Sequence, residues 1–269
     1  MKVSVVIPTF KRIELLQLCL RRLTPEVQQM NPVLYEVVVT DDCKEESAKN
    51  ALSDEFPWVR WVKGPARGPA ANRNHGVRQA TSEWILLTDD DCLPDQNWVQ
   101  AYKIAFEQHD AWFFEGKTIA DRSQFRYDEE APLNLNGGLG WSCNIAFHKK
   151  VFDRAGGFDE AFPYPAMEDV DFHQRVIPYY SCVFVQQAVI VHPWRRIDPF
   201  KRMQMQYASR VYYYRKHKST FGGTYRWKMF KSFLITVFQG AYQLIRFGGR
   251  GFKGYLAQCM LRFKLIFVN

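Results

Sequence analysis

Short runs of consecutive apolar residues recur along the first third of the chain. The run at 3–7 consists almost entirely of Val and Ile, and similar runs follow at 36–40, 58–62 and 84–88. Continuous apolar, β-branched runs of this length are typical of strands covered on both faces. Between them, apolar residues three and four positions apart from Ile13 to Leu23 predict a helix, and 68–80 is also helical in character.

The order of strand, helix, strand, helix and strand predicts an α/β fold with a mostly parallel central sheet flanked by helices. In open sheets of this kind, ligands bind at the carboxyl ends of the strands. Three of the predicted strands end in Pro8-Thr9-Phe10, Asp41-Asp42 and Asp89-Asp90-Asp91. We therefore expect these residues to meet at one edge of the sheet.

The acidic run Asp89-Asp90-Asp91 directly follows a predicted buried strand. Mg²⁺ and Mn²⁺ are hard cations that bind a few carboxylate oxygens and keep other positions for water or phosphate. Asp89 and Asp91 are two positions apart and can point the same way, so they can share one ion. The alternative is a solvated turn that caps a helix beginning near Gln96, and the run alone does not decide between the two.

Other polar segments also have two interpretations. Asp41-Asp42 can form a turn or a helix cap. The stretch before and including Arg73 and Asn74 can bind a diphosphate or be a loop that enters an ordinary helix. Glu168-Asp169 lies in the first turn of a helix predicted to end before Pro178. Acidic residues in a first helical turn are favoured by the helix dipole. The same carboxylates can act as a general base near a metal-diphosphate site.

Charge divides the chain into two parts. Of the 36 Lys and Arg residues, 16 lie from Trp194 to the end, where Asp198 is the single acidic residue. The net charge of +8 therefore combines an acidic body with a basic tail. We expect a domain at 1–193 and a basic, aromatic-rich helical extension at 194–269. The acidic body disfavours a nucleic-acid channel, so we expect no nucleic acid among the partners.

The remaining composition restricts the class of protein further. A hydrophobic content of 47% allows a sizeable core. The six cysteines are scattered without a C-x-x-C pair, which argues against a zinc site and a disulfide framework and fits a reducing compartment. The first apolar run is too short for a signal-peptide core, so we expect a cytoplasmic location.

The tail contains a mostly apolar segment at 229–247. Phe230, Phe233, Val237, Ala241 and Leu244 recur at helical spacing, and an uncharged run of 14 residues separates Lys231 from Arg246. This run is shorter than the roughly 20 apolar residues that span a bilayer. The pattern favours a helix lying in the plane of an anionic membrane surface, on the cytoplasmic face. The alternative is a helical pair packed on the catalytic domain.

Several motifs occur in a characteristic order. They are 3–10 with Pro8-Thr9-Phe10, 37–42 with Asp41-Asp42, 71–76 with Asn72-Arg73-Asn74, 86–91 with Asp89-Asp90-Asp91, Gly156-Gly157-Phe158-Asp159-Glu160 and Glu168-Asp169. In this order and spacing, residues 1–193 resemble the family 2 glycosyltransferases, which have the GT-A fold.

The resemblance implies a role for each matching residue. Asp169 would be the catalytic base, and Asp91, Asp89 and His192 would hold Mn²⁺ or Mg²⁺. The nucleotide sugar, UDP- or TDP-linked, would be bound by Pro8, Thr9, Phe10, Arg12, Asp42, Arg73, Asn74, Asp89, Asp90, Asn144 and Glu168. Direct attack by the acceptor hydroxyl would invert the anomeric carbon. The acceptor would be a surface glycan or a lipid-linked oligosaccharide.

The sequence departs from the family pattern at a few positions. Met167 stands where Gly commonly precedes the Glu-Asp pair, and Cys43-Lys44 replaces the usual Gly-Ser. The Q-x-x-R-W motif of processive synthases is absent, which favours transfer of one sugar per encounter. Two alternatives stay open: a metal-dependent nucleotidyltransferase and a non-catalytic nucleotide-sugar-binding protein. A metal-dependent nuclease would also use clustered acids, but the acidic body disfavours it. A G-x-G-x-x-G match at 249–254 follows no buried strand, so we reject a dinucleotide site there.

Overall fold

The computed structural model describes residues 1–268, which form two compact units. The sheet unit comprises Met1–Asp121, Pro132–Glu160 and Glu168–Pro193. The helical unit comprises Arg122–Ala131, Ala161–Met167 and the chain from Trp194 onward. The helical unit therefore combines the basic tail with two short segments from earlier in the sequence.

An eight-stranded sheet forms the centre of the sheet unit, in the order β3-β2-β1-β4-β8-β6-β9-β5. The first four of these strands are parallel and match the predicted runs: β1 Val3–Thr9, β2 Tyr35–Asp41, β3 Val59–Lys63 and β4 Trp84–Thr88. The strand β8, Asn144–His148, is antiparallel to both β4 and β6, Phe113–Ala120. The strand β9, Cys182–His192, is parallel to β6, and the short β5, Leu93–Pro94, is antiparallel to β9. The predicted α/β fold with a mostly parallel sheet is confirmed.

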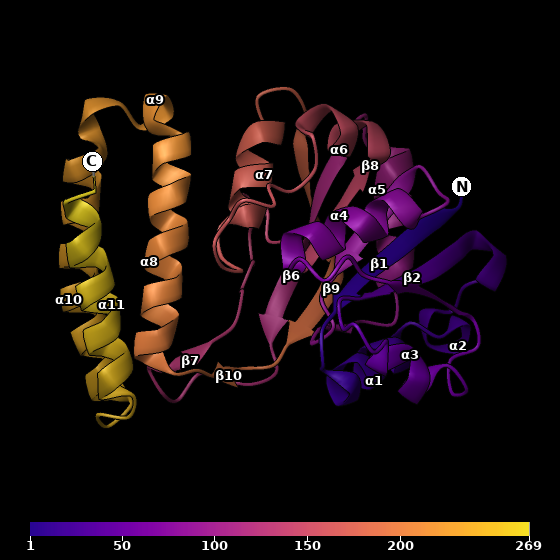
Figure 1. Cartoon of the computed structure of the whole chain (residues 1–269), viewed down its shortest axis with the longest axis horizontal. Helices are drawn as coiled ribbons and strands as arrows, with labels where there is room; N and C mark the ends of the chain where they lie inside the picture. Colours follow the sequence, from indigo (N-terminus) through magenta and orange to yellow (C-terminus); the bar gives the residue numbers. More distant parts are fainter. Residues whose placement is uncertain (269) are drawn as a thin grey trace. The chain divides into compact units, whose positions relative to one another are not determined.

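Helices cover both faces of this sheet (Figure 1). The helices α1 (Ile13–Arg22), α3 (Ser47–Leu52) and α5 (Trp98–Gln108) share one core with Val5 and Val37. The helices α4 (Pro69–Gln79), α6 (Lys149–Ala155) and α7 (Glu168–Val176) share the other core with Val6 and Val38. Because successive strand residues point to opposite faces, a strand between two helical layers needs apolar residues at every position. The short α2 (Pro25–Gln28) and η1 (Pro32–Leu34) connect α1 to β2.

One edge of the sheet collects the polar strand ends. Thr9 is paired with Asp41 at the ends of β1 and β2, and Thr88 of β4 with Asn144 of β8. At the same edge, His192 of β9 is paired with Ala120 of β6. The acidic run, Asn144 and His192 are therefore carried to the same edge by the register of the sheet.

The helical unit contains a two-stranded ribbon and a layer of helices. The strand β7 (Glu129–Glu130) is antiparallel to β10 (Arg195–Arg196). Then follow α8 (Pro199–Lys216), α9 (Lys218–Phe221), η2 (Gly222–Thr224), α10 (Tyr225–Arg246) and α11 (Phe252–Ile266). The helix α11 packs against both α8 and α10 around Met203, Leu261 and Leu265 (Figure 1). Within residues 1–268, none of the helices has the length and hydropathy needed to cross a bilayer.

Candidate active site

The acidic run at the end of β4 is held by groups from the end of β1. The Thr9 hydroxyl donates to Asp90 over 2.8 Å. The Arg12 guanidinium lies 3.1 Å from Asp90 Oδ1 and 3.0 Å from Asp91 Oδ2. Burial, together with the charges of Asp91 and Asp89, raises the pKa of Asp90 to about 6, although Arg12 and Thr9 oppose this rise. Asp90 therefore ties the ends of β1 and β4 together.

Arg73 of α4 joins the acidic run to the start of α7. Its guanidinium lies 2.9 Å from Asp89 Oδ1 and 2.9 Å from Glu168 Oε1. The Arg73 side chain is buried; this burial alone would lower its pKa, but the charges of Asp89 and Glu168 raise the pKa above its usual value. The structure thus brings together the acidic run, the arginine and the Glu-Asp pair.

The two carboxyl groups at the start of α7 hold their protons unusually strongly. Burial, reinforced by the charge of Asp169, raises the pKa of Glu168 to about 7, and Arg73 opposes this shift. Burial also raises the pKa of Asp169. Asp169 Oδ2 accepts a long hydrogen bond of 3.4 Å from the Ser142 backbone N–H. A carboxylate with a raised pKa beside a cation is suited to accept a proton.

The residue before this pair has an unusual backbone conformation. Met167 has a φ of 76°, in the left-handed region that favours glycine. A non-glycine residue there is strained. Of the two departures noted above, this one carries a visible structural cost, and it lies directly before the Glu-Asp pair.

His192 lies against Asp91, where a metal ligand was expected. Its Nδ1 is 2.8 Å from the Pro193 carbonyl oxygen, so Nδ1 carries the proton that this bond requires. In the neutral ring, Nε2 then presents a lone pair at 3.3 Å from Asp91 Oδ1. Two adjacent ligands of one octahedral ion, each about 2.1 Å from it, lie about 3 Å apart. The pair therefore fits a divalent cation.

Cys92 also lies within reach of Asp91 and His192. Burial raises the pKa of its thiol well above the usual value, and Cys143 adds to the shift. A protonated thiol is a poor ligand for Mg²⁺ or Mn²⁺, which prefer oxygen. The donor set therefore suits a hard cation held by oxygen and imidazole.

Three other predicted residues make their hydrogen bonds within the protein. Asp42 accepts from the backbone N–H groups of Ala66 (2.6 Å) and Gly68 (2.8 Å). The Asn74 amide holds the 157–160 loop through hydrogen bonds of 2.8 to 2.9 Å to both backbone groups of Phe158 and to the Glu160 carboxylate.

The third such residue, Asn144, is buried, and both the oxygen and the nitrogen of its side-chain amide form hydrogen bonds within the protein. Its Oδ1 accepts from Trp98 Nε1 and the Tyr102 hydroxyl, over 2.9 and 2.8 Å. Its Nδ2 donates to the carbonyl oxygens of Lys117 and Ala188, each over 3.0 Å. Asn144 therefore joins the start of β8 to the middle of β6 and β9, and its side-chain amide has no hydrogen-bonding capacity left over for a donor or acceptor sugar.

The remaining predicted residues lie at the end of β1. Pro8 is buried within the strand, opposite Thr40 of β2. Phe10 is 55% exposed, beside the predicted nucleotide position. An exposed ring at a strand end can stack on a base without rearrangement of the core.

Glu115, a buried carboxylate in β6, was not predicted from the sequence. It accepts hydrogen bonds from three consecutive backbone N–H groups, those of Gly138, Leu139 and Gly140, over 2.8 to 2.9 Å. Asn134 and Cys182 donate to it as well. These bonds lower the pKa of Glu115, although burial alone would raise it. A single acid directly after an apolar aromatic run, Trp112-Phe113-Phe114, was the available signal.

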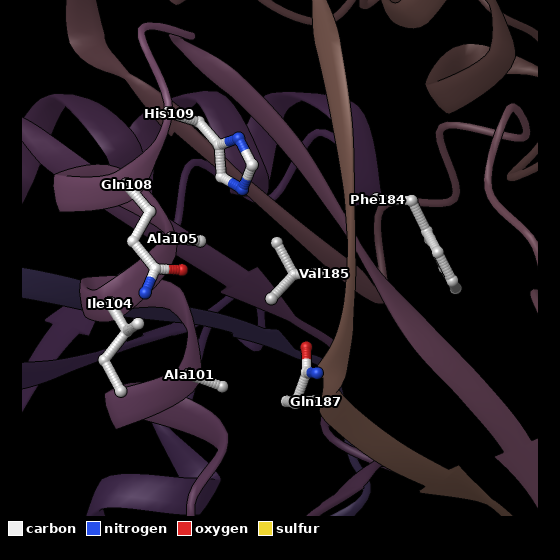
Figure 2. Close-up of a pocket in the computed structure, with 8 residues that line it drawn as sticks. All are labelled: Ala101, Ile104, Ala105, Gln108, His109, Phe184, Val185 and Gln187. Atoms are coloured by element: carbon white, nitrogen blue, oxygen red, sulfur yellow. The ribbon is translucent and has the colours of Figure 1, made fainter.

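A separate hollow of about 290 Å³ lies between α5 and β9 (Figure 2). Its lining contains none of the predicted site residues: Ala101, Ile104, Ala105, Gln108, His109, Phe184, Val185 and Gln187. It lacks the carboxylates and arginines that a metal and a diphosphate require. The strand-end cluster is therefore the candidate active site.

Comparison with known proteins identifies the family of the chain that carries this cluster. Residues 4–154 match the family model described as Glycosyl transferase family 2. The glycosyltransferase AglE of Haloferax volcanii is 23% identical over 223 residues, which cover 76% of this chain and 71% of AglE.

Two solved structures share the GT-A fold seen here. S. aureus TarS 1–349 in complex with UDP superposes with a TM-score of 0.58 at 17% identity, covering 78% of this chain and 65% of that one. The mannosyltransferase PcManGT from Pyrobaculum calidifontis, in complex with GDP-Man and Mn²⁺, gives a TM-score of 0.60 at 18% identity, covering 81% and 64%. The chain thus spans slightly less than two thirds of each of these structures. Because the family model matches more than half of the chain, the protein is a glycosyltransferase that belongs to family 2.

Proposed function

We propose that this protein transfers one sugar from a nucleoside-diphosphate sugar to an acceptor hydroxyl, with inversion at the anomeric carbon. The contact that carries the proposal is Arg73, which lies 2.9 Å from both Asp89 and Glu168. It brings the acids that suit a metal and the acids that suit a base into one site. Family membership favours glycosyl transfer over nucleotidyl transfer or nucleic-acid cleavage.

The donor side consists of the groups around the acidic run. Asp91, Asp89 and His192 would hold Mn²⁺ or Mg²⁺, which when bound neutralises the charge developing on the leaving diphosphate. Arg12 and Arg73 supply guanidinium groups that can bind the phosphate oxygens. Mn²⁺ accompanies GDP-Man in the PcManGT structure, and UDP is bound in the TarS structure, which supports a nucleotide donor of this class.

The nucleotide itself would lie over the ends of β1 and β2. Pro8 and Thr9 form the floor, and the exposed ring of Phe10 can stack on the base or ribose. Asp42 accepts two backbone hydrogen bonds and still has lone pairs for a base N–H, as expected for a UDP- or TDP-linked donor. Asp90 and Asn74 hold neighbouring segments in place.

The acceptor side lies at the start of α7. Asp169 removes the proton from the attacking hydroxyl, and its raised pKa favours this transfer near neutral pH. Glu168 keeps Arg73 in place beside Asp89. Direct attack on the face opposite the diphosphate inverts the anomeric centre. The absence of a Q-x-x-R-W motif supports the transfer of one sugar per encounter. The acceptor we propose is a surface glycan or a lipid-linked oligosaccharide at the cytoplasmic face of a membrane.

Nucleotide-sugar hydrolysis tests this assignment without knowledge of the acceptor. The purified chain is incubated with a panel of UDP-, TDP- and GDP-sugars with Mn²⁺, and the release of nucleoside diphosphate is measured. We expect Asp169→Asn to lower kcat by about 10² to 10⁴. We expect Asp91→Asn to weaken the Mn²⁺-dependent stabilisation by nucleoside diphosphate.

Asp153→Asn on the exposed side of α6 serves as the control and should leave both readouts unchanged. Full hydrolysis by a folded Asp169→Asn variant would remove Asp169 from the role of base. Binding of a nucleotide sugar without any turnover by the wild type would instead indicate a non-catalytic nucleotide-sugar-binding protein. The anomeric configuration of the sugar first released, read by NMR, tests inversion.

A further inference from the structure

The helix α10 is apolar on two sides, and the two sides have different surroundings. Phe233 packs on Phe263 of α11, with ring centroids 5.6 Å apart, and the Val237 carbonyl accepts from the Tyr255 hydroxyl. Both residues belong to the stripe that the sequence pattern placed against a membrane. Phe233 faces α11 instead, so that part of the prediction is corrected, whereas Phe230 of the same predicted stripe is exposed.

A second stripe on α10 is exposed. It recurs every three or four residues and consists of Trp227, Phe230, Leu234, Phe238, Tyr242 and Ile245. Phe238 is 70% exposed and Ile245 is 77% exposed. Such a continuous apolar stripe costs free energy in water and marks a contact surface.

The helix α11 carries a matching exposed stripe. Its members are Phe252, Leu256, Met260, Phe263 and Phe267. The helix α8 packs against the other side of α11, through Ala257, Leu261 and Leu265, and meets the start of α10 at Met229. The exposed stripes of α10 and α11 lie away from these contacts with α8, and together they make up the apolar face of the α10–α11 hairpin.

The charge around this apolar face is of one sign. Lys228, Lys231 and Arg246 of α10 and Lys253 and Lys264 of α11 are exposed. The chain contains no Asp or Glu after Asp198. Long basic side chains can keep their charges in water while their stems follow an apolar surface. A broad apolar face bordered only by cations complements anionic headgroups over an apolar interior.

We propose that the exposed face of the α10–α11 hairpin docks in the plane of a bilayer that contains anionic phospholipid. The two helices lie flat, with the aromatic stripes below the headgroups and the lysines and arginines at headgroup level. This surface deepens the proposed function, because it brings the enzyme to a lipid-linked acceptor. Docking itself does not require catalysis.

Vesicle flotation of the full chain tests the proposal. The probes are vesicles of phosphatidylcholine alone and vesicles with added phosphatidylglycerol. We expect binding to the anionic vesicles that decreases as the salt concentration rises. The double variant Phe238→Glu/Ile245→Glu should lower the binding constant at least tenfold, since both side chains are exposed and outside the core of the unit. Lys228→Gln/Lys231→Gln should reduce binding to anionic vesicles alone.

Val33→Glu is the matched control, because Val33 in η1 is 72% exposed and lies outside the hairpin. It should bind vesicles like the wild type. Thermal unfolding verifies that each variant is folded. Absence of vesicle binding by the wild type, or undiminished binding by Phe238→Glu/Ile245→Glu, would overturn the proposal.

Two further outcomes are informative. In the first, the wild type binds no vesicles but forms a stable dimer in light scattering, and Phe238→Glu/Ile245→Glu abolishes this dimer. A second copy of the chain would then cover this face, and the membrane proposal would be wrong. Vesicle binding by a chain that hydrolyses no nucleotide sugar would leave the docking surface standing while the proposed transferase function fails.

Discussion

Burial and the neighbouring Asp169 carboxylate disfavour the charged form of Glu168 and raise its pKa, whereas Arg73 favours the charged form and lowers the pKa. The net result is a pKa of about 7, above the usual value of a glutamate. A raised carboxyl pKa means that the folded state binds the proton more tightly than the unfolded state. The associated stability is therefore fully present below the unfolded pKa and is lost as the pH rises through about 7.

We expect the metal-free protein to lose stability between about pH 4.5 and pH 7.5, by on the order of 2 to 3 kcal/mol from this group. Glu168→Gln removes the titrating group, so its stability should fall less steeply over the same range, even though it is less stable overall because Arg73 loses a partner. Urea unfolding at a series of pH values measures both slopes. Parallel pH profiles of the wild type and Glu168→Gln would contradict the assignment.

At the scale of elements, Glu115 acts as a buried anion around which the 137–140 loop folds. Gly137, Gly138 and Gly140 all have positive φ, which lets consecutive N–H groups of the loop converge on one carboxylate. The same loop leads into Ser142, whose N–H reaches Asp169. A Cβ at Gly140 would lie 2.3 Å from His173 Cβ of α7, so the loop and α7 are closely packed. Glu115 therefore positions the loop next to the proposed base.

Glu115→Gln should keep the fold but disturb this loop, because an amide cannot accept all of these bonds. We expect a loss of about 1 to 3 kcal/mol in unfolding free energy and a roughly tenfold lower kcat for nucleotide-sugar hydrolysis, from a misplaced Asp169. Stabilisation by UDP and Mn²⁺ should not change, since the donor groups lie elsewhere.

Glu36→Gln is the control for stability alone. Glu36 is a partly buried carboxylate at the start of β2, bonded to Ser4 and Thr81, at the opposite edge of the sheet. It should lower stability without changing kcat. Unchanged kcat in a folded Glu115→Gln variant would show that Glu115 stabilises the loop without positioning the base.

The elements that the sequence predicted best are those fixed by local pattern. The β4 strand was predicted to the residue, because an apolar run between turns leaves little choice of register. The convergence of Thr9 and the acidic run followed from strand ends at one edge, whereas Arg73 lies on α4 and was expected near them from the diphosphate interpretation of its stretch and from the family resemblance. The pairing partner of Asn144 and the role of Glu115 depend on contacts between distant segments, which local pattern does not contain. The exposed side of α10 was missed for the same reason, since only α11 decides which apolar side is covered.

At the scale of the molecule, the basic tail shares its compact unit with two earlier segments of the chain. The segment Arg122–Ala131 belongs to the same unit, where Glu130 contacts Arg202 at 2.9 Å and Tyr127 N–H donates to the Arg250 carbonyl. The acids at 128–130 thus neutralise part of the tail's positive charge. Charge asymmetry indicated a boundary near Trp194, but it could not show that earlier segments complete the unit.

This arrangement predicts the outcome of removing the tail. A chain ending at Pro193 keeps Arg122–Ala131 but lacks β10, α8 and α11, so Glu130 and Tyr127 lose the partners named above. We expect trypsin to cut after Arg122 and Arg126 at least ten times faster in the shortened chain than in the full one, because opening of the segment no longer breaks these contacts. Cleavage after Arg154, exposed on α6, provides the internal reference and should be unchanged. Equal cleavage of the two chains at Arg126 would show that this segment is held without the tail. If the shortened chain is cut as expected, truncation both disrupts the helical unit and removes the proposed membrane surface. A loss of vesicle binding by the shortened chain would then have two causes. Substitutions at Phe238 and Ile245 therefore test membrane docking more directly than truncation does.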